Sequence, residues 1–200
     1  MILKQIEQKY NSCTKCDYCM NDCKVFGYGN HNADIMVVGE GPGGVECETK
    51  VPFTGPAGKL LDKILAAIKL ERDTLYFTNV VICRTNEKNR TPSWNEIQNC
   101  YNRLQEEIEI VKPNIILMVG NPSLKTFFGQ HSKVTQCHGQ WFVDFKPPYA
   151  RYFSIMHPAW ALHSSTEGEL KAKKRTIWND IKIFRNTLDT INFKLKRNKE

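Results

Sequence analysis

The sequence lacks any apolar run approaching the roughly 20 residues that a membrane-spanning helix needs. Its first residues, MILKQIEQKYNSC, carry charged and polar side chains where a secretory signal peptide would have an apolar segment. It also shows no internal repeat, no low-complexity segment and no linker. We therefore expect one soluble, intracellular domain over residues 1–200, acting as a monomer without a membrane partner.

Acidic residues are the minority charge. The chain has 21 Asp and Glu against 28 Lys and Arg, which gives a net charge of +7. This balance favours a polyanionic partner, although charge alone does not separate nucleic acid from a general solubility preference. Four of the positive charges lie in residues 192–200, which we interpret as a solvated basic tail.

Cysteine, by contrast, is abundant, with eight residues. In a reducing compartment this predicts metal binding or catalysis rather than a disulfide framework. Four of the eight lie in CTKCDYCMNDC, residues 13–23, with the spacing Cys-x2-Cys-x2-Cys-x3-Cys of bacterial ferredoxins. A Lys follows rather than the ferredoxin Pro, and the rest of the chain is unlike a ferredoxin. The spacing leaves open whether these cysteines form one site or share one with cysteines elsewhere.

Short apolar runs alternate with helical patterns along the chain. The pattern predicts strands at 33–40, 75–83 and 114–120 and in QWFVDF and RYFSIM, and helices at 56–70, 122–128 and 169–191. A further helix begins at Ser93, where Glu96 three residues later completes a capping box. This alternation predicts a single α/β domain with a central, mostly parallel sheet of about four strands, flanked by helices on both faces.

Polar and glycine-rich segments follow three of these strands. They are GEGPGGVE after the first, TN at the end of the second and HPAW after the last. Ligands of such sheets bind at the carboxyl ends of the strands. We therefore expect the three segments to converge on one active site.

Three motifs resemble the family 4 uracil-DNA glycosylases. VVGEGPGGVECETKVPFTGPAGKLLDKIL (37–65) is similar to the first motif of that family, TNVVICR (78–84) to its Asn-bearing strand and MHPAWAL (156–162) to its His-Pro loop. The motifs are in the family's order and spacing and span nearly the whole chain. The resemblance implies a uracil-DNA glycosylase-like fold, and a hydrolase that removes uracil from single- or double-stranded DNA in base excision repair.

The resemblance also implies a cofactor. Family 4 enzymes hold a structural [4Fe–4S] cluster with four cysteines, which correspond here to Cys13, Cys16, Cys83 and Cys100, the first two within an arm of residues 1–30. Four thiolates suit zinc equally well by their chemistry. Cys19 and Cys23 are then expected to be free thiols in a loop, and Cys47 and Cys137 to be non-ligands.

The family's base pocket maps onto residues of all three motifs. Phe53 would stack on the uracil, although a buried Phe is usually only core packing. Asn79 would bind the edge of the base through its amide, and His157 would stabilise negative charge on the departing uracil. Isolated residues of these types are more often structural, so these roles depend on the resemblance.

The first motif would supply the remaining groups of the pocket. Glu46 holds the position that crowds C5 of the base and rejects thymine. Gly39 and Gly41 would bring backbone N–H groups close to the substrate. Glu40 is the best candidate for orienting or deprotonating the attacking water, because Gly41 stands where family 1 enzymes have an Asp.

DNA contacts are expected from two segments. The resemblance places Arg84, Lys88 and Arg90 near the phosphates, with a solvated turn as the alternative for this loop. Pro158 would press on the DNA backbone, and Trp160 or Leu162 would act as a wedge in the minor groove. Packing of Trp160 on the last helix is an equal alternative.

Several positions depart from the family pattern. Cys47 stands where the family usually has Asp, Lys50 where it has Gly and His163 where it has Arg. The segment NEKNRTPSW contains no His, which disfavours covalent capture of DNA. These departures keep three alternatives open: a catalytically weak or inactive DNA-binding relative, a glycosylase for another modified uracil or deaminated base, and a zinc-stabilised protein acting on nucleotides.

Overall fold

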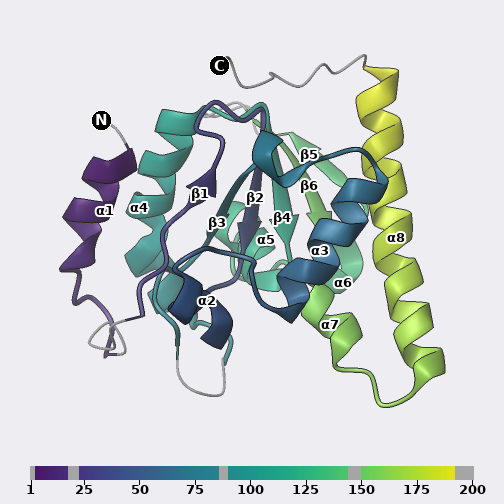
Figure 1. Ribbon diagram of the computed structural model, residues 1–200, viewed down its shortest axis with the longest axis horizontal. Helices are drawn as coiled ribbons and strands as arrows, with labels where there is room; N and C mark the ends of the chain where they lie inside the picture. Colours follow the sequence, from purple (N-terminus) through teal and green to yellow (C-terminus); the bar gives the residue numbers. More distant parts are fainter. Residues whose placement is uncertain (1–2, 18–22, 86–89, 144–149, 192–200) are drawn as a thin grey trace.

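A six-stranded sheet forms the centre of the described part of the protein (Figure 1). The computed structural model describes residues 3–17, 23–85, 90–143 and 150–191. The strands are β1 (Tyr28–Gly29), β2 (Ile35–Gly39), β3 (Tyr76–Asn79), β4 (Ile115–Val119), β5 (Trp141–Val143) and β6 (Arg151–Ile155), in the spatial order β1-β3-β2-β4-β6-β5.

The four central strands confirm the predicted parallel sheet. β3, β2, β4 and β6 pair in parallel, and β1 and β5 add a short antiparallel strand at each edge. Every residue of β2, β3 and β4 is buried, which explains the continuous apolar runs of β2 and β4; β3 ends in the buried polar residues Thr78 and Asn79. β1 was not predicted because its two residues are too few for a pattern. In QWFVDF the strand covers 141–143, and the last two residues lie outside the described part.

Helices cover the sheet in two layers. α3 (Pro56–Ala67), α7 (Pro158–Leu162) and α8 (Glu167–Thr190) contact one another on one face, and α1 (Leu3–Asn11), α4 (Trp94–Val111) and α5 (Asn121–Phe128) form the other layer. Figure 1 shows α3 and α8 in front of the sheet and α5 behind it. The prediction of an α/β fold with helices on both faces is confirmed.

Helix caps match the sequence signals where these were clear. The Ser93 hydroxyl accepts a hydrogen bond from Glu96 N at 3.3 Å, and Glu96 Oε2 accepts one from Ser93 N at 2.6 Å, which is the predicted capping box. α8 begins two residues before the predicted start because Thr166 caps it. Sequence reasoning did not predict α1 or α7, nor the short helices α2 (Gly44–Thr49) and α6 (Val134–Cys137) and the 3-10 turn Arg72–Thr74.

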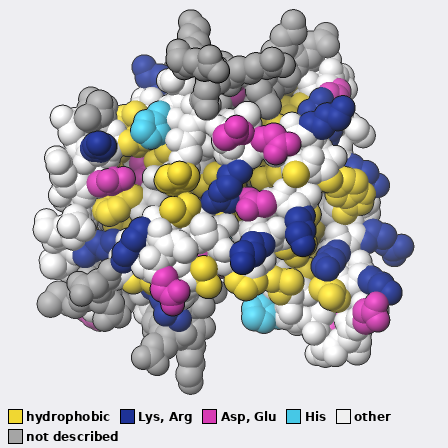
Figure 2. Space-filling model, in the orientation of Figure 1, with side chains coloured by type: hydrophobic (Ala, Val, Ile, Leu, Met, Phe, Trp, Pro, Cys, Tyr) yellow, Lys and Arg dark blue, Asp and Glu magenta, His cyan; other side chains and the backbone are white. Residues whose placement is uncertain are grey.

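On the face that Figure 2 shows, charged side chains are spread out rather than gathered in one patch. Figure 2 shows Lys and Arg side chains over α3 and α8, with fewer Asp and Glu side chains among them. Within the described ranges, no helix combines the length and the apolar character needed to cross a membrane. The predicted basic tail, residues 192–200, lies outside the described part.

Candidate active site

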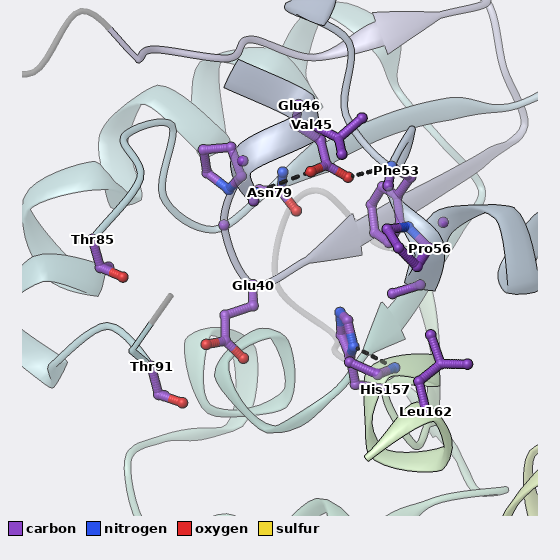
Figure 3. Close-up of a pocket in the computed structure, with 18 of the residues that line it drawn as sticks. Glu40, Val45, Glu46, Phe53, Pro56, Asn79, Thr85, Thr91, His157 and Leu162 are labelled. Atoms are coloured by element: carbon purple, nitrogen blue, oxygen red, sulfur yellow. Dashed lines mark hydrogen bonds between the residues drawn. The ribbon is translucent and has the colours of Figure 1, made fainter. Parts of the chain in front are cut away.

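One cavity of about 590 Å³ opens at the carboxyl ends of the parallel strands. The segments after β2, β3 and β6 all line it, as the sequence predicted. Glu40, Asn79 and His157 come from three different strands, and Figure 3 shows them around a common space with Phe53 and Glu46. Three segments that are far apart in the chain therefore form one site.

Phe53 lies in the cavity wall in a strained backbone conformation. Its φ is +59°, which a non-glycine residue rarely adopts, and its side chain is 6% exposed. Its ring packs against Phe77, with ring centroids 5.7 Å apart. Gly58 permits this turn, because a Cβ there would overlap the Phe53 carbonyl group. The ring is therefore fixed by its surroundings.

Arg72 holds this strained turn from outside. Its guanidinium donates hydrogen bonds to the carbonyl oxygens of Phe53, at 3.3 Å, and Pro52, and it pairs with Asp62 at 2.8 Å. The same group lies over the Phe77 ring, 4.2 Å from its centroid. Sequence reasoning missed Arg72, because nothing in its neighbourhood indicates a partner almost 20 residues earlier.

Asn79 ends β3 and is 5% exposed. Its side chain lies over Gly39 on the adjacent strand, where a Cβ would collide with both Asn79 Oδ1 and the Phe53 ring. Gly39 therefore allows the amide and the aromatic ring to meet. Sequence reasoning had singled out Gly39 because it lacks a side chain, but had used this to predict a close approach of its backbone N–H group to the substrate.

A buried ion pair fixes the backbone of this strand end. Arg103 is fully buried on α4, and its guanidinium donates to the carbonyl oxygens of Asn79 and Val80, at 2.7 Å for Val80. Glu107 pairs with Arg103 at 2.9 Å and accepts a hydrogen bond from the Thr78 hydroxyl at 2.7 Å. Sequence reasoning missed this network, since charged residues on an amphipathic helix usually face solvent.

His157 is held in a single orientation at the start of α7. Its Nδ1 accepts a hydrogen bond from Ala159 N at 3.2 Å, which leaves Nε2 as the protonated nitrogen of the neutral ring. Burial, with a smaller contribution from His163, lowers the pKa of His157 to about 4. The imidazole is therefore neutral at physiological pH and can donate one hydrogen bond into the cavity.

Glu40 follows β2 and lines the same cavity. Burial raises the pKa of its carboxyl group, and a hydrogen bond from the Thr91 side chain partly opposes this. A raised pKa makes the carboxylate a better proton acceptor near neutral pH. This environment suits the predicted base.

Glu46 connects the two loops that form the roof of the cavity. Its Oε2 accepts from Gly43 N at 3.1 Å and its Oε1 accepts from Gly55 N at 2.8 Å, as the dashed lines in Figure 3 show. Both carboxylate oxygens are thus occupied by backbone N–H groups. The side chain lines the pocket as a fixed wall, and Gly41 lies in the same lining.

The expected His-Pro loop is a short helix, α7. Pro158 is buried, so its ring offers little surface for the predicted DNA contact. Trp160 is partly buried and packs toward α8, where Lys173 Nζ lies 5.2 Å from its ring centroid. Leu162 is 41% exposed and lines the cavity. Trp160 also lines the cavity, so both residues keep their predicted place as wedge candidates.

The predicted phosphate contacts differ in their surroundings. Arg84 lies beside the first turn of α2, near Gly44. Arg90 lines the cavity, but Glu96 holds its guanidinium through two hydrogen bonds of 2.6 and 2.9 Å. A phosphate at Arg90 would compete with this carboxylate. Lys88 lies outside the described residues.

Three of the four predicted metal ligands are buried thiols, and the four lie in one region. Asn99 on α4 holds the segment between Cys13 and Cys16, because its side-chain amide donates hydrogen bonds to Lys15 O at 2.9 Å and to Cys16 Sγ at 3.5 Å. Burial raises the pKa of the Cys100 thiol, which also interacts with Cys13, Cys16 and the backbone of Ile82, next to Cys83. Thiolates are the donors that iron–sulfur clusters and structural zinc require, so the residues fit the group chemically. No three Cys, His, Asp or Glu side chains of the described ranges are arranged around a common metal position.

The expectation that Cys23 is a free thiol was wrong. Cys23 forms a disulfide with Cys47 of α2, and their Cα atoms are 5.0 Å apart. The segment that begins at Cys23 runs antiparallel to residues 82–84, through backbone hydrogen bonds of Val25 with Ile82 and of Arg84 with Cys23, which brings it beside α2. A sequence separation of 24 gives no signal of this pairing. Cys137 is unpaired, and Cys19 lies outside the described residues.

Comparison with known proteins identifies the family. The Uracil DNA glycosylase superfamily profile matches residues 26–182. A type-4 uracil-DNA glycosylase of Sulfurisphaera tokodaii is 38% identical over 169 residues, covering 81% of this chain and 76% of the relative. The type-4 uracil-DNA glycosylase of Archaeoglobus fulgidus is 34% identical and covers 80% of this chain and 83% of the relative. That of Thermotoga maritima is 36% identical and covers 69% of this chain and 72% of the relative. The chain therefore belongs to the uracil-DNA glycosylase superfamily and, within it, to the type-4 uracil-DNA glycosylases.

Proposed function

We propose that this protein hydrolyses the N-glycosidic bond of uracil in DNA and leaves an abasic site, with the described cavity as its active site. The observation that carries the proposal is the meeting of Asn79, Phe53 and His157, from three separate segments, around one cavity. In DNA, the target base has to leave the helical stack to reach such a pocket. Membership of the type-4 family supports uracil as that base.

The neutral His157 and the amide of Asn79 have complementary tasks. The Asn79 side chain would pair with the edge of the base, because an amide both donates and accepts. As the C1′–N1 bond breaks, its electron pair moves to uracil N1 and spreads to O2. The Nε2–H of His157 would donate to that oxygen, since Nδ1 is already occupied by Ala159 N. The phenyl ring of Phe53 would stack on the base.

Glu40 would complete the reaction at the sugar. Water adds to C1′ as the base departs, and its proton passes to the Glu40 carboxylate, whose raised pKa suits it as acceptor. The products are free uracil and an abasic deoxyribose. Glu46 would exclude thymine as a fixed wall, because its carboxylate is tied to Gly43 and Gly55 and cannot swing away from a methyl group.

A [4Fe–4S] cluster held by Cys13, Cys16, Cys83 and Cys100 is part of the proposal, with zinc as the alternative for the same thiolates. The cluster would tie the N-terminal arm to α4 and to the segment after β3, and would take no part in bond breaking. Iron, sulfide and zinc analysis of anaerobically purified protein, with its visible absorption spectrum, distinguishes the two groups. Absence of both metals would refute this part.

The activity itself is tested with a single-uracil oligonucleotide, followed by hot alkali and a denaturing gel. We expect a cleaved band with uracil and none with thymine at the same position. Replacing the uracil by 5-substituted uracils or by deaminated purines tests the alternative substrates. An intact uracil strand beside an active control enzyme would refute the proposal and favour an inactive DNA-binding relative.

A further inference from the structure

A second hollow lies next to the proposed uracil cavity. It has a volume of about 270 Å³ and lies between the first turns of α4 and α5, and Thr91 and Pro92 line both cavities. α5 follows β4, the neighbour of β2 in the sheet, so both hollows open at the same edge. They are adjacent compartments of one surface.

The lining of the second hollow combines an aromatic face with positive charge. Trp94 is partly buried and packs against the core, which fixes its indole. Lys125 contributes an ammonium group, and the exposed His131, whose ring lies 3.3 Å from Gln130 Nε2, lines the hollow with that amide. None of the described residues that line it is acidic. Aromatic platforms beside basic groups are how proteins bind single-stranded nucleic acid without base-pair readout.

The size and position of the hollow identify which nucleotide it suits. Its volume falls below the roughly 300–1,000 Å³ of sites for drug-sized ligands, which is appropriate for one base with its phosphate. A strand whose uracil occupies the first cavity passes the shared wall at Thr91 and Pro92. The next nucleotide of that strand is therefore delivered to the second hollow.

We propose that this hollow binds the nucleotide adjacent to the uracil on the same DNA strand, with its base stacked on Trp94 and its phosphate at Lys125. The inference rests on the proposed function. Binding in this hollow gives the enzyme a preference for DNA in which the nucleotide adjacent to the uracil is free to leave the base stack. Thr91, in the shared wall, also lines the cavity that contains Glu40.

The test compares single-stranded oligonucleotides that carry a normal nucleotide or a baseless spacer on the 5′ or the 3′ side of the uracil. For the wild type we expect one of the two spacers to raise KM about tenfold, as loss of one stacked base implies. Trp94→Ala should raise KM by a similar factor with the normal strand and lose its sensitivity to that spacer. Trp94→Phe should restore both, since a phenyl ring still stacks.

Three further variants separate stacking from charge and packing. Lys125→Ala should raise KM several-fold and lessen its dependence on salt by about the 0.7 expected for one phosphate contact. Trp178→Ala and Lys182→Ala, on α8 away from both hollows, should leave KM and the spacer response at wild-type values.

The outcomes distinguish the two proposals. If the wild type excises uracil and Trp94→Ala still responds to the spacer as the wild type does, the neighbouring nucleotide is not at Trp94 and the inference fails. If the wild type excises no uracil, the proposed function fails instead. In that case fluorescence anisotropy of the same oligonucleotides measures the spacer effect on binding without turnover, and an equal effect in wild type and Trp94→Ala would again overturn the inference.

Discussion

Replacement of Arg72 by Ala should impair catalysis in the pocket, although Arg72 is not among the residues that line it. The substitution removes two hydrogen bonds to the carbonyl groups of Pro52 and Phe53 and the ion pair with Asp62. Phe53 at φ +59° carries a conformational cost of about 1–2 kcal/mol. Without the guanidinium, the turn can relax to a more favourable conformation and move the phenyl ring out of the pocket.

The expected effect on catalysis follows from the ring. Stacking of one base on an aromatic side chain is worth about 1–3 kcal/mol, so we expect kcat/KM for uracil to fall by about 10- to 100-fold. The free energy of unfolding should fall by only about 2 kcal/mol, because hydrogen bonds to a charged group are worth about 1.5–3 kcal/mol each when buried and the Arg72 side chain is 29% exposed.

Arg185 provides a matched control on α8. Its side chain is 35% exposed, pairs with Asp189 and donates to the carbonyl oxygen of Ile68 at 3.3 Å. Arg185→Ala should lose comparable stability and keep kcat/KM within about twofold. Single-turnover rates measure the effect of both variants on catalysis, and urea unfolding measures their effect on stability. Wild-type activity in Arg72→Ala, or equal losses of activity in both variants, would refute the role of Arg72.

Three further predictions concern titration and the disulfide. Because the pKa of His157 is about 4 in the folded protein and about 6.5 in the unfolded chain, its contribution to stability is present above pH 6.5 and is lost as the pH falls toward 4. Urea unfolding should show that the free energy of unfolding of the wild type falls by up to about 3 kcal/mol more than that of His157→Asn between pH 7.5 and pH 4.5. Equal losses in the two proteins would contradict this role of His157. Glu40→Gln should lower kcat/KM and remove the acidic limb of the pH profile of kcat/KM. In the wild type this limb should lie at a higher pH than an ordinary Glu would give, because the pKa of Glu40 is raised. An unchanged profile would show that Glu40 is not the base. Cys47→Ser should lower the free energy of unfolding by about 3 kcal/mol without reductant, because the disulfide closes a loop with a sequence separation of 24. In dithiothreitol the substitution should change the free energy of unfolding little. The same difference in both conditions would show that the Cys23–Cys47 bond is not the cause.

Local sequence signals predicted the centre of the fold well. Apolar runs identified β2 and β4 without any polar interruption, and β3 despite Thr78 and Asn79, because strands buried on both faces need no alternation. Ser93 and Glu96 located the start of α4 because a capping box involves only four consecutive residues. The edge strand β1 and the helix α7 are short, and packing rather than local sequence determines them; α1 has Leu3, Ile6 and Tyr10 buried at helical spacing, a signal that sequence reasoning did not use.

The site was predictable only in part, for the same reason. Motif residues such as Asn79 and His157 could be placed because they follow strands whose ends meet at one edge of the sheet. Arg72 and Arg103 could not, because their partners lie about 20 or more residues away and depend on tertiary contacts. The Cys23–Cys47 disulfide was missed because a reducing compartment made Cys23 an expected free thiol, and because a sequence separation of 24 gives no local signal of the pairing.

The most direct test of the central claim is the single-turnover rate of uracil release by Asn79→Ala and His157→Ala. One contact that stabilises charge in a transition state is typically worth about 3–4 kcal/mol, so each variant should be slower than the wild type by roughly two to three orders of magnitude. The exposed Asn186→Ala and His31→Ala serve as controls and should match the wild type. Undiminished uracil release by both Asn79→Ala and His157→Ala would contradict the assignment of the cavity as the active site.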